Sequence, residues 1–78
     1  MTTVKDAEKI AYESVASIPT LEKNDNVRLG YHVFQLLTGK IESVEEAVKV
    51  SNPRSDMPKD EMVKIITENL KNAGIEKL

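Results

Sequence analysis

The segment VRLGYHVFQLL, residues 27–37, constrains the fold of this chain more than any other stretch of its sequence. On a helical wheel its apolar side chains cover roughly 220° of the circumference. Only Arg28, His32 and Gln35 occupy the remaining sector, and their i, i+4, i+7 spacing aligns them as one narrow polar strip. A helix that is apolar over most of its surface packs against several neighbours. We therefore expect residues 26–38 to form a central core helix, with the first and last helices packed against it.

Gly30 lies within that apolar arc, where so small a residue needs an explanation. A glycine inside a helix costs roughly 1 kcal/mol relative to alanine, so the close approach of a neighbouring helix is the expected compensation. The face of the first helical segment that carries Ala7 and Ala11 is flat enough to be that neighbour. Gly39, just after the last periodic residue, is expected to end the helix as its C-terminal cap.

Three further segments repeat their apolar residues with the spacing of a helix, and no segment shows the period-two alternation of a strand. Ser43 and Glu46 form a capping-box pattern at the start of the short third segment. Asp25 or Asn26 is expected to cap the central helix, and Gly74 to end the last helix in a Schellman arrangement. The predicted helices are residues 4–18, 26–38, 44–51 and 58–73.

The composition predicts one small domain with an aliphatic core. The chain has 78 residues, of which 40% are apolar but only 4% aromatic, and it contains no cysteine. A core of this size rarely supplies more than about 3–5 kcal/mol of stability, and no disulfide or thiolate metal site can add to it. The sequence therefore predicts an all-α fold: a single helical domain over residues 1–78, built as a compact bundle of about four helices whose third helix is short.

The charge pattern argues against nucleic acid and membrane partners. Acidic and basic residues are well mixed along the chain, and the net charge is −2. Binding to nucleic acid or anionic lipid normally requires a basic patch, and no run approaches the roughly 18 apolar residues of a membrane span. The N-terminal residues lack the apolar stretch of a signal peptide, so a cytoplasmic location is expected.

Catalytic, cofactor and metal sites are not expected. The only histidine is His32, and no nucleophile stands in a recognisable turn. One histidine without cysteine leaves too few ligands for a zinc site, and no acidic loop of the calcium-binding kind occurs. The acidic pairs Glu45–Glu46 and Asp60–Glu61 lie in first helical turns, where the helix dipole accounts for them.

A nucleic-acid-binding regulator of the helix-turn-helix type is the main alternative function. FQLLTGKIESVEEAVKV, residues 34–50, reads as helix, glycine turn and helix. The ending ITENLKNAGIEKL is similar to the close of the third helix in winged-helix regulators, a resemblance that implies DNA binding. However, each candidate recognition helix begins with two acidic residues, whereas phosphate contacts require basic ones. Arg28, Arg54 and Lys59 provide at most a small basic edge.

A carrier protein is a third and less favoured alternative. In length and helix order the chain is similar to the acyl carrier proteins, which attach phosphopantetheine to a serine in an Asp-Ser-Leu motif at the start of the second long helix. The nearest match here is Ser43 in the tripeptide ESV, which opens the short third helix and already serves as its cap. That family is also strongly acidic, whereas this chain is nearly neutral.

Binding to another protein, or to a second copy of itself, is the function that we favour from the sequence. The apolar stripes offer more aliphatic surface than a short third helix covers, so one face is available for a partner. Arg28, His32 and Gln35 form the candidate contact strip, because they cross the central helix and include the chain's only histidine. Met57, in the loop before the last helix, is a further candidate because methionine adapts to partner surfaces.

Overall fold

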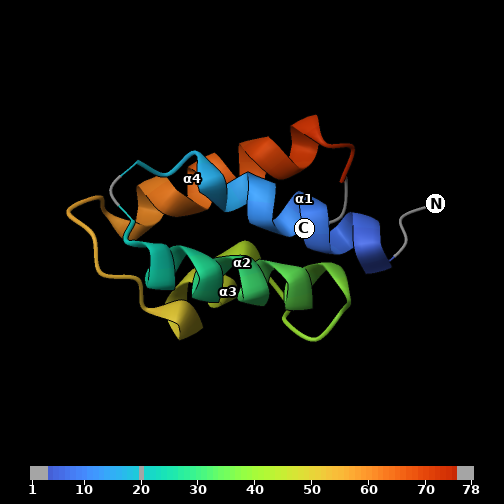
Figure 1. The fold of residues 1–78 in the computed structure, drawn as a ribbon, viewed down its shortest axis with the longest axis horizontal. Helices are drawn as coiled ribbons and strands as arrows, with labels where there is room; N and C mark the ends of the chain where they lie inside the picture. Colours follow the sequence, from blue (N-terminus) through green and yellow to red (C-terminus); the bar gives the residue numbers. More distant parts are fainter. Residues whose placement is uncertain (1–3, 20, 76–78) are drawn as a thin grey trace.

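Four helices make up the regular structure of residues 4–19 and 21–75, the parts of the chain that our computed structural model describes (Figure 1). They are α1 (Val4–Ala16), α2 (Lys23–Leu37), α3 (Val44–Ser51) and α4 (Lys59–Asn72). No strand occurs in those two ranges. The expected all-α bundle with a short third helix is therefore confirmed.

The helices follow one another around the bundle, as Figure 1 shows. α2 lies side by side with α1 and α3, and α4 closes the ring by packing against α3 and α1. We expected the last helix to pack against the central one, but within the described ranges α4 lies across the core from α2. Because α2 has close neighbours on two flanks only, the side that is turned away from the core stays open to solvent.

The core is aliphatic, as the composition predicts. Every helix contributes at least two of its fully buried side chains, so no single helix pair holds the fold together. At roughly 1.5–3 kcal/mol for each large side chain removed from water, this cluster is the main source of stability. Its members are Ala11, Val15, Ile18, Leu29, Val33, Val44, Ala47, Val48, Met62, Ile66 and Leu70.

Both glycines that were expected to end helices do so. Gly39 adopts a φ of +88°, a left-handed conformation that side chains disfavour. The N–H of Lys40 donates to the carbonyl of Gln35 at 2.8 Å, and that of Gly39 to the carbonyl of Leu36 at 3.1 Å, which together form a Schellman motif. Gly74 ends α4 with the same pair of bonds, at a φ of +91°.

The start of α3 also follows local sequence rules, whereas the start of α2 does not. Ser43 Oγ accepts a hydrogen bond from the N–H of Glu46 at 3.1 Å, as the capping box predicts. α2 begins three residues earlier than expected, at Lys23, and its N-cap residue Glu22 makes no side-chain hydrogen bond. Asp25, one of the two expected caps, lies inside the first turn and is 1% exposed.

The end of α1 is capped by side chains from two other helices. Asn26, the second residue expected to cap α2, donates from Nδ2 to the carbonyl of Val15 at 2.8 Å. Asn69 of α4 donates from Nδ2 to the carbonyl of Ser14 and to the Oγ of Ser17, both at 2.9 Å. The last carbonyls of α1 therefore accept hydrogen bonds from residues that are distant in sequence, which local capping motifs do not predict.

Gly30 makes room for α1, as expected, but through a different residue. A Cβ added at Gly30 would overlap the ring of Tyr12, which is the nearest group to that position. We expected the flat face around Ala7 and Ala11 to make this approach. A ring lying across a glycine explains why α2 tolerates the cost of glycine in mid-helix.

Candidate interaction surface

The outward side of α2 exposes a mixed apolar and basic surface. We call it the α2 face, and it consists of Val27, Arg28, Tyr31, His32 and Gln35. Val27 and Tyr31 are each 49% exposed and lie one helical turn apart. We expected both as part of the apolar core arc, and this was wrong: with α4 across the core, no further helix of the described chain packs over that side of α2.

The three residues of the predicted polar strip all lie on the α2 face, and each already has a partner within the chain. Gln35 Nε2 donates to the hydroxyl of Tyr31 at 3.3 Å. Arg28 Nη1 lies 3.6 Å from Asp25 Oδ1. His32 Nδ1 lies 2.6 Å from Ser51 Oγ. All three side chains of the strip thus make a contact within the chain.

The bond between His32 and Ser51 has a defined direction. Ser51 Oγ donates its single proton to the carbonyl of Ala47 at 2.7 Å. Its lone pairs must then accept from His32, so Nδ1 of the ring carries a proton. The pair links α2 to α3, and it fixes the orientation of the imidazole on the α2 face.

Asp25 is the most unusual group in the described structure. Its side chain is completely buried, and neither carboxylate oxygen has a hydrogen-bond partner there. Two guanidinium groups lie just beyond hydrogen-bonding distance: Arg28 Nη1 is 3.6 Å from Oδ1, and Arg54 Nε is 3.7 Å from Oδ2. The arginine side chains are 52% and 79% exposed. We call these three residues the Asp25 cluster.

Removing a carboxylate from water is expensive unless charges and hydrogen bonds compensate it. The positive end of α2 and the two guanidinium groups supply charge, but the carboxylate gains no hydrogen bond in return. The pair of Asp25 and Arg28 was predictable from the sequence, because residues three positions apart are neighbours on a helix. Arg54 comes from the loop between α3 and α4, so its approach to Asp25 depends on tertiary structure.

Within Lys23–Leu37 the exposed charge is all of one sign, and the exposed acid Glu22 stands just before the helix as its N-cap. Lys23 and Arg28 are exposed, and Asp25, the only acid in the helix, is buried. Arg54 adds a third positive charge from the neighbouring loop. This segregation contrasts with the net charge of −2 for the chain as a whole.

Met57, the other residue predicted to contact a partner, lies elsewhere. Its side chain is half-buried and packs against the core cluster. Its N–H donates to Ser55 Oγ at 3.1 Å, a bond within the loop. The structure therefore groups three of the four predicted contact residues on α2 and places the fourth against the core.

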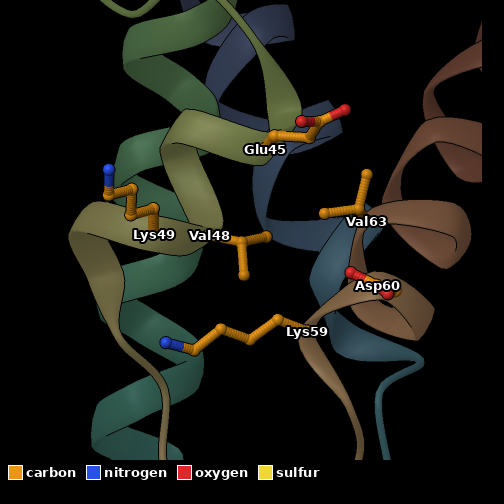
Figure 2. Close-up of a pocket in the computed structure, with 6 residues that line it drawn as sticks. All are labelled: Glu45, Val48, Lys49, Lys59, Asp60 and Val63. Carbon is orange, nitrogen blue, oxygen red and sulfur yellow. The ribbon is translucent and has the colours of Figure 1, made fainter.

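A groove between α3 and α4 is the alternative surface (Figure 2). It has a volume of about 480 Å³ and a floor formed by Val48 and Val63. Figure 2 shows charged side chains of both signs around it, from α3 and from the start of α4. Lys59 Nζ already donates to Asn52 Oδ1 at 3.0 Å. Its complete lining is Glu45, Val48, Lys49, Lys59, Asp60 and Val63. Mixed signs give this groove no preference for the charge of a ligand.

Neither metal ligands nor known relatives assign a function. The described residues contain no group of three histidine, cysteine or acidic side chains that could hold a metal ion. None of the four helices there combines the length and apolar character needed to cross a membrane. No protein-family model, curated protein or solved structure matches this chain.

Proposed function

We propose that the protein is a non-enzymatic interaction module that binds another protein through the α2 face. The observation that carries this proposal is the position of Val27 and Tyr31. Among the described residues, three large apolar side chains are about half exposed, and these two lie together on one helix. Tyrosine and arginine, together with tryptophan, are the residue types enriched among those that dominate binding energy at protein interfaces. The α2 face has one tyrosine and one arginine, Tyr31 and Arg28.

The surroundings of Tyr31 suit it to binding because they hold it in place in advance. Its hydroxyl accepts a bond from Gln35, and the backbone beside it is fixed where Gly30 packs against Tyr12. The neighbouring His32 ring lies 5.7 Å away, centroid to centroid, and is itself tied to Ser51. A surface that is ordered before binding loses less conformational entropy when the partner docks.

The test is an affinity capture from native lysate with the wild-type protein and with Tyr31→Ala and Val27→Thr variants. We expect stoichiometric capture of a partner protein by the wild type, and at least a roughly tenfold loss with Tyr31→Ala, as for a central interface residue. Val27→Thr keeps the shape but adds a hydroxyl, so a smaller loss is expected. Capture that is unchanged in both variants would contradict the proposal.

Val63→Thr is the matched control, because it makes the same replacement in the groove between α3 and α4. Loss of capture with this variant alone would show that the partner binds in that groove instead of on the α2 face. Nuclease treatment in parallel separates a protein partner from nucleic acid. Recovery that disappears with nuclease would support the helix-turn-helix alternative, despite the acidic first turns of α3 and α4.

A further inference from the structure

We infer that the partner presents an acidic, amphipathic segment to the α2 face, with a carboxylate seated on Arg28 and Arg54 and apolar side chains against Val27 and Tyr31. This inference rests on the proposed function and adds the chemistry of the partner. Three features of the described structure carry it: the single sign of the exposed charge on α2, the free donors of the Asp25 cluster, and the apolar residues beside them.

The first feature is electrostatic. The exposed charges of α2 are positive, and Arg54 extends them across the neighbouring loop. Complementary charge steers partners and excludes those of like sign. An acidic segment is attracted to this surface, whereas a basic one is repelled by it.

The second feature is the unused hydrogen-bonding capacity of the two arginines. A guanidinium group has five N–H donors in a planar fork. Neither arginine forms a hydrogen bond with Asp25, since both contacts exceed 3.5 Å, and both side chains are more than half exposed. Asp25 thus holds the guanidinium groups near one point by charge and leaves their donors available. A partner carboxylate can accept from such forks in the bidentate geometry that arginine favours.

The buried carboxylate itself also needs an explanation. Burying Asp25 costs stability in a domain that has little to spare, and an apolar residue of similar size would avoid that cost. Sites at which a protein departs from the rules of stability are commonly the functional ones. Asp25 acts here as a positioning residue that brings Arg54 from its loop to Arg28 on α2.

The third feature favours a protein over a nucleic acid. Val27 and Tyr31 border Arg28 on the same helix, and each is half exposed. A nucleic acid binds best to a surface with a longer series of basic side chains, because each phosphate contact adds to affinity through counterion release. An alternation of acidic and apolar groups matches what the α2 face displays.

The test is selection of a random peptide library, displayed on phage, against the full chain. The key variant combines Arg28→Gln and Arg54→Gln with Asp25→Asn, so that no buried charge is left without a counter-charge. The control is Lys64→Gln on α4, which is exposed and lies on another helix. The triple variant loses two positive charges and one negative charge, so both proteins change net charge equally. Circular dichroism verifies that each variant is folded.

We expect selection to enrich peptides that combine Asp or Glu with large apolar residues. Such a peptide should bind the triple variant at least about tenfold more weakly than the wild type and the control. Its binding should perturb the backbone amide resonances of α2 and of Arg54.

Three results would overturn the inference. Enrichment of neutral or basic peptides whose binding depends on Tyr31 would contradict the acidic character of the partner but would agree with the proposed function. Absence of any enriched peptide, together with lysate capture that still depends on Tyr31, would show that the partner presents no linear segment. Binding of a single-stranded DNA oligonucleotide that the triple variant loses, with a steep dependence on salt, would assign the arginines to phosphate instead.

Discussion

The two ends of α2 are built on different principles. At its C-terminal end, Gly39 adopts a φ of +88° and a Schellman motif satisfies the last carbonyls, all within six consecutive residues. At its N-terminal end, the cap residue Glu22 makes no side-chain hydrogen bond, and a buried carboxylate lies in the first turn. One end obeys local rules and the other is determined by contacts with Arg54 and α1.

This difference separates the end of α2 that stabilises the helix from the end to which we assign binding. At the C-terminal end, residues that are close in sequence form the hydrogen bonds that cap the helix. The end that departs from local rules carries Arg28, is approached by Arg54 from the loop after α3, and borders Val27 on the α2 face. The cost of a buried carboxylate is concentrated at the end of the helix to which we assign binding. Three sets of substitutions test how far this contrast extends.

The largest effect is expected at the Asp25 cluster. Replacing Arg28 and Arg54 together with Gln leaves the Asp25 carboxylate buried without a counter-charge, which should lower the free energy of unfolding by up to about 3 kcal/mol. The same replacements in an Asp25→Asn background should cost less than about 1 kcal/mol, because the arginines are largely exposed. Urea unfolding of all four proteins gives the coupling energy. Equal costs in both backgrounds would show that Asp25 does not depend on the arginines.

A smaller loss is expected at the other end of the helix. Gly39→Ala forces a side chain into a left-handed conformation, which costs roughly 1–2 kcal/mol. Apart from the two flanking residues, no heavy atom lies within 4 Å of the Cβ that would be added, so the cost comes from the backbone conformation. Gly74→Ala is the matched control, since its φ and its surroundings are nearly the same. Thermal unfolding should show similar losses for both, and an unchanged midpoint for Gly39→Ala would contradict the role assigned to it.

The smallest expected effect is a gain in stability at the N-cap of α2. Glu22 has the extended backbone of an N-cap, with φ −69° and ψ 156°, but no side-chain cap bond. Glu22→Ser supplies a short hydroxyl for that bond and should stabilise the protein by roughly 0.5 kcal/mol. Ser43→Ala, which removes the existing cap of α3, should have the opposite sign and cost about 1 kcal/mol. A loss of stability with Glu22→Ser would mean that the start of α2 depends on the glutamate charge instead.

The sequence predicted the parts of the fold that depend on near neighbours. The caps at Gly39, Gly74 and Ser43 were predictable because each motif spans only a few consecutive residues. The start of α2 was not, because Asn26 bonds to α1 and Asp25 pairs with a loop beyond α3. No local pattern encodes those contacts.

The candidate site was predictable to a similar extent. Helical spacing places Arg28, His32 and Gln35 on one strip, and the structure has them on one face. The exposure of Val27 and Tyr31 could not be read from periodicity, because it depends on which helices surround α2. Apolar character alone does not distinguish a side chain packed in the core from one that awaits a partner.

The hydrogen bonds that close α1 have a consequence for how the bundle opens. Asn69 reaches the carbonyl of Ser14 across 55 positions of sequence, and Asn26 reaches Val15 across 11. Any fluctuation that lifts α4 away therefore removes the Asn69 donor from the end of α1, and any fraying of that turn releases both asparagines. These bonds tie the end of α1 to both α2 and α4, so the opening of α1 is coupled to movement of those two helices.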